Sequence, residues 1–149
     1  MAEKVDRRVR KTKAQLRAGL ARLMQKKSIK EITVKELVEE VDINRSTFYL
    51  HYTDIYQMLE SIEAELMDEV SHLVEDYPLD PLNNKESSYP FIEQIFTILD
   101  NNKDICIALL GKNGDMAFVS RIEKLIADTV LHRLLAIACL PGIANPRNA

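Results

Sequence analysis

Residues 33–52 read TVKELVEEVDINRSTFYLHY, and this stretch decides the fold because its pattern predicts two short helices joined by a tight turn. Thr33, with Glu36 three residues later, forms a capping-box pattern, so the first helix should begin at Thr33. Asp42 in the turn tolerates left-handed backbone geometry, and Asn44 can cap the second helix. The first helix should bury the apolar residues that recur at helical spacing, which are Val34, Leu37, Val38 and Val41.

The second helix, predicted over residues 45–52, has little apolar surface beyond Phe48, which we expect in the core. A helix this short is not stable alone, so its neighbours must hold it. It displays hydrogen-bonding groups suited to phosphates and base edges. They are Arg45, Ser46, Thr47, Tyr49, His51 and Tyr52. This pattern is typical of a recognition helix, and the alternative interpretation is an ordinary helical hairpin in an all-α domain.

Over about residues 11–65 the sequence resembles the tetracycline-repressor (TetR) family of bacterial transcriptional regulators. The resemblance rests on the basic first helix, on the start TVKEL, and above all on STFYLHY followed by a new helix start at Asp54. One position departs from the family, which often carries a phosphate-binding lysine just inside the fourth helix, where Ile55 stands here. More weakly, residues 90–134 resemble the C-terminal domain of the dihydroxyacetone-kinase-regulator subgroup of the same family.

The resemblance implies a helix-turn-helix that binds double-stranded operator DNA. Arg45 lies in the first turn of the presumed recognition helix and can take a bidentate guanine contact, worth roughly 1–3 kcal/mol of discrimination. Ser46 and Asn44 are secondary candidates for base edges. Thr33 and Lys35 suit a phosphate at the start of the preceding helix. The resemblance implies that Thr47, Tyr49, His51 and Tyr52 occupy positions that face phosphates or pack in the family. Of these four, Tyr52 is the one best suited to the core.

The charge of the chain is divided unevenly along its length. Residues 1–52 hold 13 Lys and Arg against 7 Asp and Glu, a balance of +6, whereas residues 53–149 hold 7 against 16, a balance of −9. The two sum to the formal net charge of −3. Charge alone would also fit ordinary solvated helix faces, but together with the motif it indicates that the N-terminal part meets a polyanion.

We predict an all-α protein in which an N-terminal three-helix helix-turn-helix domain is joined by a long fourth helix to a small C-terminal helical bundle. Glycine and proline number only 9 among 149 residues, and this scarcity favours helices. The expected divisions are a flexible basic arm at 1–10, the DNA-binding domain at 11–56, a regulatory and dimerisation domain at 57–140 and a disordered tail at 141–149.

Five further helices are expected from the periodicity, over residues 12–26, 54–75, 90–99, 103–110 and 115–139. The first should bury Leu16, Leu20 and Leu23. The long helix 54–75 should bury an apolar stripe and expose an acidic face that carries Glu60, Glu63, Glu65, Asp68 and Glu69. The helix 90–99 is apolar nearly all round, a pattern that predicts burial.

The C-terminal part permits two interpretations, a ligand pocket or a filled core. A pocket would bind a mostly apolar small-molecule effector, and the residues expected to line part of it are Phe91, Phe96, Cys106, Leu109 and Met116. A filled core explains the same stripes equally well.

Nothing in the sequence points to catalysis, so we predict that the protein is not an enzyme and needs no cofactor or metal. His51, His72 and His132 lack partners at metal-ligand spacing, and no Ser–His–acid or Cys–His set is suggested. Cys106 and Cys139 each lie in an apolar run and fit a reducing compartment. We see no signal peptide, and the longest apolar run, 134–140, is too short to span a bilayer. The expected location is the cytoplasm.

The function predicted from the sequence is that of a TetR-type transcriptional regulator, most simply a repressor. It would bind a palindromic operator as a homodimer and respond to a small-molecule effector. In the alternative, the helical body binds a partner protein instead of a small molecule.

Overall fold

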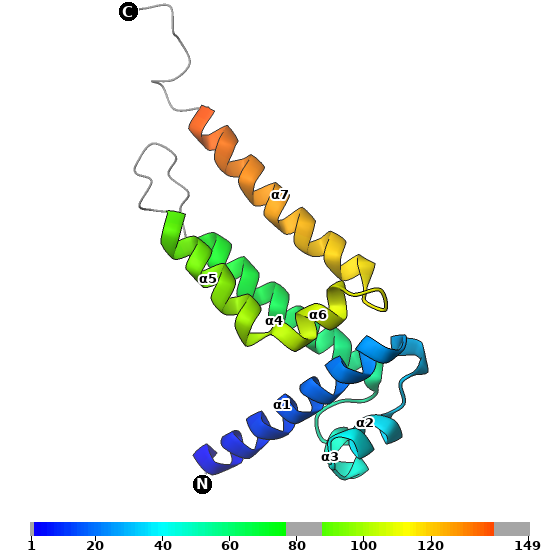
Figure 1. Cartoon of the computed structure of the whole chain (residues 1–149). Helices are drawn as coiled ribbons and strands as arrows, with labels where there is room; N and C mark the ends of the chain where they lie inside the picture. Colours follow the sequence, from blue (N-terminus) through cyan, green and yellow to red (C-terminus); the bar gives the residue numbers. More distant parts are fainter. Residues whose placement is uncertain (1, 77–87, 139–149) are drawn as a thin grey trace, which may run out of the picture.

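The computed structural model describes residues 2–76 and 88–138, and in these ranges helices are the only regular secondary structure, without strands (Figure 1). The predicted all-α class is therefore confirmed for the described residues. In chain order the elements are α1 (Ala2–Lys26), the 3-10 helix η1 (Ile29–Glu31), α2 (Val34–Glu40), α3 (Arg45–Tyr49), α4 (Ile55–Asp76), α5 (Ser88–Asn101), α6 (Lys103–Leu110) and α7 (Met116–Ala138). We call α1 to α3 the head and α5 to α7 the body; α4 runs between them (Figure 1).

The head is built around a core of apolar side chains from α1, α2, α3 and the first turns of α4. The predicted inward residues of α1 are all buried, and so are Leu37, Val38 and Phe48. Val34 and Val41 pack against this core while remaining partly exposed. Gly19 lies where α1 approaches α2, and a Cβ atom there would overlap a methyl group of Val41. The close approach of these two helices therefore depends on a residue without a side chain.

Helix α1 begins at Ala2 rather than at the predicted Thr12. The expectation of a flexible arm over residues 1–10 was therefore wrong for residues 2–10, which are helical. A physical reason is visible in the charge pattern, because Asp6 and Arg10 lie one turn apart and form an ion pair of 3.4 Å. Such pairs support a helix at its surface, and no glycine or proline interrupts this one before Gly19.

Helix α4 carries the predicted apolar stripe, from Ile55 to Val74, and its first half completes the core of the head. One residue of the acidic face that was expected to be exposed is buried, because Glu63 is only 4% exposed. The reason lies on α7, where Arg121 donates a hydrogen bond to the Glu63 carboxylate at 2.5 Å. A contact across 58 residues of sequence has no signature in the local pattern.

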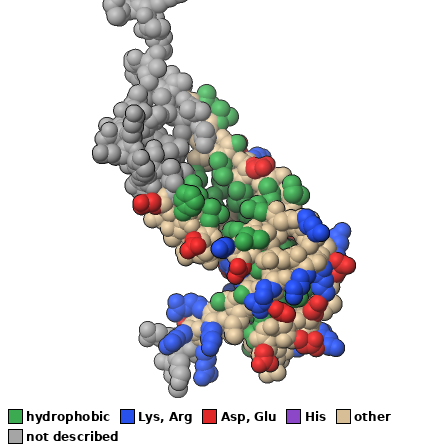
Figure 2. Space-filling view, viewed as in Figure 1, with side chains coloured by type: hydrophobic (Ala, Val, Ile, Leu, Met, Phe, Trp, Pro, Cys, Tyr) green, Lys and Arg blue, Asp and Glu red, His purple; other side chains and the backbone are tan. Residues whose placement is uncertain are grey.

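The body does not bury its apolar residues as the sequence suggested. Helix α5 was predicted to be buried all round, yet Phe96 is 67% exposed and Leu99 is 43% exposed. Helix α6 packs against α1 of the head, whereas α7 packs against α4 and α6 (Figure 1). Apolar side chains remain at the surface of the body in Figure 2, and the large ones include Ile107, Leu110, Met116, Ile126, Leu131 and Leu135. Within residues 2–76 and 88–138, no helix covers these side chains.

Some predictions fall outside the described residues. They are the tail at 141–149, Cys139 and the side chain of Phe91. The domain boundaries at 56 and 140 remain predictions.

Candidate nucleic-acid interface

The first half of the helix-turn-helix is fixed by the local signals that its sequence contains. The Thr33 hydroxyl accepts a hydrogen bond from the Glu36 backbone N–H at 3.2 Å, so Thr33 caps α2 as predicted. The Glu36 side chain does not complete a capping box but forms an ion pair with Lys27 at 2.5 Å. Asp42 has a φ of 53° and thus supplies the predicted left-handed residue of the turn.

Helix α3 is held in place from beneath by aromatic residues. Phe48 is fully buried, and its ring lies 5.7 Å from that of Tyr52 and 5.4 Å from that of Tyr49. The helix ends at Tyr49, three residues earlier than expected, because the chain then turns toward α4. The N–H groups of His51 and Tyr52 donate to the Phe48 carbonyl at 2.9 and 3.0 Å, so both residues lie in the turn after the helix.

The predicted base-reading residues are brought together on the exposed side of α3. Asn44, Arg45 and Ser46 are all exposed at its N-terminal end. The Asn44 side chain makes no capping bond, which leaves its amide available to a ligand. Arg45 donates to the Tyr49 hydroxyl at 3.2 Å, and its guanidinium carbon lies 5.6 Å from the centre of the Tyr49 ring. Tyr49 thus orders Arg45 along the surface of the helix.

The predicted phosphate contacts are less uniform. Lys35 is exposed, and its ammonium group lies 3.9 Å from Glu39, a separation too long for a strong ion pair. Thr47 and His51 are half-buried at the edge of α3. Thr33 is exposed, and its hydroxyl oxygen accepts the cap bond from Glu36, so both its O–H hydrogen and its backbone N–H can donate to a phosphate.

Tyr52 belongs to the core instead of the surface. It is 5% exposed, and burial raises the pKa of its hydroxyl. The Lys13 ammonium lies 5.8 Å from the centre of its ring, which links α1 to the end of α3. The sequence allowed Tyr52 either to face a phosphate or to pack in the core, and its burial fits packing.

Two surface residues beside α3 were missed by the sequence reasoning. Leu50, the C-terminal cap of α3, is 79% exposed, and Tyr56 in the first turn of α4 is 52% exposed. Ile55, at the position where the family resemblance placed a lysine, is buried. Tyr56 is thus the first α4 side chain to reach solvent, and the apolar–polar alternation at 55–56 could have signalled it.

Basic side chains surround the N-terminal part of α1. Arg7, Arg8, Arg10 and Lys11 are exposed there. This end of α1 and helix α3 lie at the same end of the molecule, away from α5 and α7 (Figure 1). Figure 2 shows lysine and arginine side chains gathered around the start of α1. The polar face of α3 and the cations of α1 thus lie at one end of the molecule, and cations are what a surface that meets phosphates requires.

Of the residues predicted to line an effector pocket, the four with described side chains are not grouped around one cavity. Leu109 belongs to the main core, whereas Phe96 and Met116 are 67% and 72% exposed. Cys106 is half-buried, and burial raises the pKa of its thiol. It borders an open hollow of about 500 Å³ between α5 and α6, together with Leu99, Lys103, Ile107, Leu110 and Gly111.

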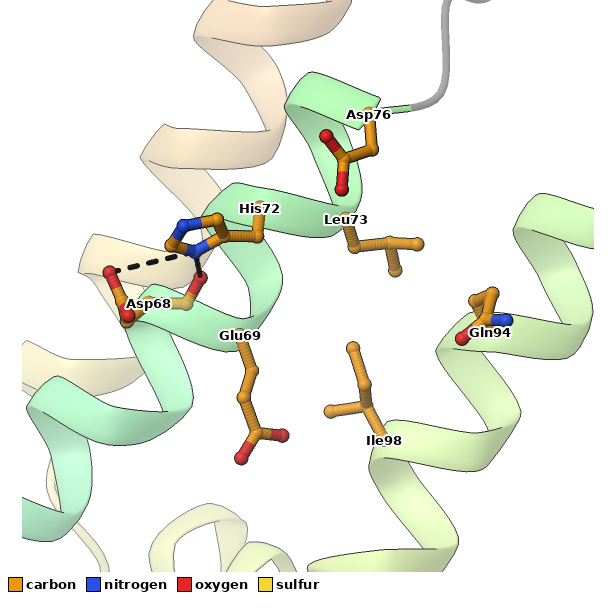
Figure 3. Close-up of a pocket in the computed structure, with 7 residues that line it drawn as sticks. All are labelled: Asp68, Glu69, His72, Leu73, Asp76, Gln94 and Ile98. Atoms are coloured by element: carbon orange, nitrogen blue, oxygen red, sulfur yellow. Dashed lines mark hydrogen bonds and ion pairs between the residues drawn. The ribbon is translucent and has the colours of Figure 1, made fainter.

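A second open hollow, of about 610 Å³, lies between α4 and α5 (Figure 3). Its walls carry Asp68, Glu69, Asp76 and His72 beside the apolar Leu73 and Ile98. The ring of His72 is turned back onto its own helix, with Nδ1 2.8 Å from the Asp68 carbonyl oxygen, and this contact raises the pKa of His72. None of Phe96, Cys106, Leu109 and Met116, the predicted pocket residues whose side chains are described, borders this hollow.

Comparison with known proteins finds a similarity for the C-terminal part of the chain. Residues 86–139 match the family model TetR_C_8, described as a transcriptional regulator C-terminal region. No curated protein matches the chain. Residues 86–139, which include α5 to α7, are thus similar to the C-terminal region of TetR-type transcriptional regulators. Within the described ranges, no cluster of three or more potential metal ligands occurs. Over the same ranges, every helix is too short or too polar to cross a membrane.

The exposure of Phe96 leads to a prediction about stability. Replacing Phe96 with alanine should cost well below the roughly 3–5 kcal/mol of a buried phenylalanine, because little cavity is created. Urea unfolding of the isolated monomer at low concentration measures this cost. A loss as large as that of a core phenylalanine would mean that the ring is enclosed.

Proposed function

We propose that the chain is a sequence-specific DNA-binding transcriptional regulator of the TetR type, most simply a repressor. The observation that carries this proposal is the polar face of α3. A five-residue helix exposes Asn44, Arg45 and Ser46 while Phe48 anchors it from below. Such a helix has no packing use for its polar face, whereas a major groove offers base edges to its N-terminal residues and phosphates on both sides.

The operator is proposed to be palindromic and the protein a homodimer. Two identical heads reading one duplex require half-sites about one helical turn apart or a multiple of it. The exposed apolar residues of the body support association, because contiguous surfaces of this kind are uncommon on monomers. Light scattering across a range of protein concentrations tests this part of the proposal, and a monomer at every concentration would contradict it.

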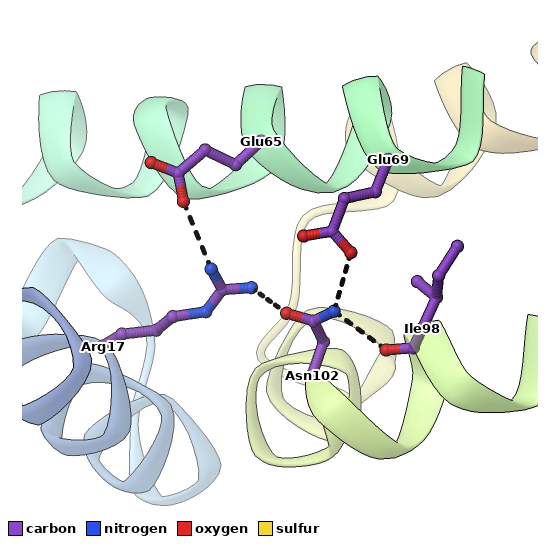
Figure 4. Close-up of polar contacts among 5 residues, drawn as sticks. All are labelled: Arg17, Glu65, Glu69, Ile98 and Asn102. Carbon is purple, nitrogen blue, oxygen red and sulfur yellow. Dashed lines mark hydrogen bonds and ion pairs between the residues drawn. The ribbon is translucent and has the colours of Figure 1, made fainter. Parts of the chain in front are cut away.

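A polar junction between head and body offers a way for events in the body to reach DNA (Figure 4). Arg17 of α1 donates to the Glu65 carboxylate of α4 at 3.3 Å and to the side-chain oxygen Oδ1 of Asn102 at 2.5 Å. The Asn102 amide donates in turn to Glu69 at 3.1 Å and to the Ile98 carbonyl oxygen at 2.8 Å. Asn102 is 8% exposed, so the bonds that its side chain makes are partly shielded from water, whereas the bond between Arg17 and Glu65 is exposed.

An effector that prefers one arrangement of this junction would change the position of the head relative to α4. The coupling free energy between effector and DNA can be no larger than the difference in the effector's binding free energy for the two arrangements, typically about 1–3 kcal/mol. The first candidate for the effector is a small molecule. The apolar rim around Cys106, formed by Leu99, Ile107 and Leu110, favours a protein partner as the second candidate.

Arg45→Ala tests the assignment of α3 directly. We expect the variant to lose about 1–3 kcal/mol of binding to its specific site and much less on random duplex, because Arg45 should contact a base. Fluorescence anisotropy with both duplexes at one salt concentration measures the two losses. An equal loss on both would make Arg45 a phosphate contact instead.

A further inference from the structure

The carboxyl group of Glu63 is buried where α4 meets the start of α7. Its Oε2 atom accepts a hydrogen bond from Arg121 at 2.5 Å. Its Oε1 atom is shielded from solvent and has no hydrogen-bond partner among the donors of the described residues. Since buried polar atoms are nearly always paired, the group that faces Oε1 decides how this oxygen is satisfied.

The group that faces Oε1 is the carboxyl of Asp115, the residue before α7, which lies within hydrogen-bonding reach of the Glu63 side chain. Asp115 is half-buried, and its Oδ1 atom accepts from the backbone N–H of Ala117 at 2.8 Å. Two ionised carboxylates are both acceptors, so in that state neither can donate to the other and their charges repel. One proton between them turns the same contact into a hydrogen bond.

The surroundings of the pair favour a position of this proton on Glu63. Burial raises the pKa of Glu63 most strongly, and Asp115 raises it further, whereas Arg121 lowers it. Asp115 lies at the N-terminus of α7, where the backbone N–H groups favour a negative charge. Neutral Glu63 can still accept from Arg121 at Oε2 while it donates from Oε1 to Asp115.

Other charged groups near Glu63 are screened by water or lie on another face of α4. On the α7 side, Arg121 is the counter-charge, and its side chain is 56% exposed and thus shared with solvent. On α4, Glu60 and Asp68 lie on the same side as Glu63 but are exposed. Helix α5 packs against the face of α4 that carries Glu69. The burial of two negative charges beside one shared guanidinium is therefore not offset from elsewhere in this contact.

We propose that Glu63 and Asp115 share one proton and make the contact between α4 and α7 sensitive to pH. When the proton is present, Glu63 Oε1–H donates to the Asp115 carboxylate and bonds the two helices. When the pH rises, the proton passes to water, this bond is lost, and two carboxylates repel each other across the contact.

The sign of the pH dependence follows from the proton affinity of the folded state. The pKa of Glu63 is raised in the folded chain above its ordinary value of 4.5, so the folded state binds this proton more tightly than the unfolded state. The stability that the bond contributes is fully present below the ordinary pKa and is lost as the pH rises through the raised pKa. Any effect on DNA binding rests on the proposed function, whereas the contact itself is measured without DNA, so either proposal can fail alone.

The test compares urea unfolding of the full chain and of Asp115→Asn at one protein concentration, over roughly pH 5 to 8. Asparagine keeps an oxygen for the Ala117 cap and supplies an N–H to Glu63 Oε1, so it imitates the protonated pair. At the alkaline end, the unfolding equilibrium constant of the variant should be about tenfold smaller than that of the wild type. This gain should shrink as the pH falls. Asp128→Asn makes the same change at an exposed position of α7 and should show no gain that varies with pH.

Two further measurements keep the test independent of that variant. Glu63→Gln places an N–H toward Asp115 and keeps an oxygen for Arg121, so it should show the same gain. The carbon-13 NMR signal of the Glu63 carboxyl in the wild type should titrate at higher pH than the exposed glutamates, and at lower pH in Asp115→Asn than in the wild type. A Glu63 signal that titrates with the exposed glutamates would overturn the proposal. Folded variants that both lack a gain, or that gain equally at every pH, would overturn it as well.

Discussion

Replacing Phe48 with alanine is expected to destabilise the protein by about 3–5 kcal/mol and to abolish DNA binding. Phe48 is the one fully buried side chain of α3 and lies in contact with Tyr49 and Tyr52. A helix of five residues has no stability of its own, so a cavity beneath it should release α3 from the head. Because domains are stable by only about 5–15 kcal/mol, the loss is a large fraction of the total.

Urea unfolding followed by circular dichroism measures the loss of stability, and anisotropy with a labelled duplex measures binding. Tyr49→Ala is the matched control, because Tyr49 is the next residue of the same helix and is 47% exposed. It should cost much less stability. A Phe48→Ala variant with the unfolding midpoint of the wild type would show that α3 is held by something other than this core.

The second large effect is the salt dependence of DNA binding. The exposed cations at the start of α1, together with Lys35 and Arg45, should displace counterions from the phosphates. The logarithm of the binding constant should fall with the logarithm of salt concentration by about 0.9 per phosphate contact. A complex with six to ten contacts would lose about 10³–10⁵ in affinity between roughly 50 and 200 mM salt.

Anisotropy titrations at a series of salt concentrations give the slope. Lys11→Ala should reduce it by about 1, whereas Lys124→Ala, which removes an exposed lysine of α7 in the body, should leave it unchanged. A flat response to salt would remove DNA as the main partner of the head.

The head was predictable because its signals are local. The Thr33 cap, the left-handed Asp42 and the leucines of α1 each follow from residues within a few positions of one another. The early start of α1 was missed because a charged, polar segment was interpreted as loose. The ion pair between Asp6 and Arg10 was nevertheless present at the spacing that supports a helix.

The body was less predictable because its burial depends on partners far away in the sequence. Periodicity indicated that α5 is apolar, but it could not indicate what covers Phe96. Glu63 lies beside the apolar stripe of α4, and only the distant Arg121 makes its burial tolerable. Leu109 lies in the core while Phe96 and Met116 are exposed, for the same reason: shared apolar character does not place side chains around one cavity.

The candidate interface lies between these cases. Its N-terminal residues could be predicted because exposure of the polar residues on α3 follows once Phe48 faces inward. The roles of its C-terminal residues could not, because they depend on where α3 ends. Because the helix ends at Tyr49, Tyr52 lies in the core, and Leu50 and Tyr56 are the residues that are exposed there instead.

The central claim is that α3 reads a DNA sequence, and selection from a pool of randomised duplexes tests it most directly. The full chain and its Arg45→Ala variant are each incubated with the pool, and the bound duplexes are sequenced. We expect the wild type to enrich a shared motif arranged as an inverted repeat, and the variant to lose base preference at one position in each half. A folded wild-type chain that enriches no motif would contradict the account.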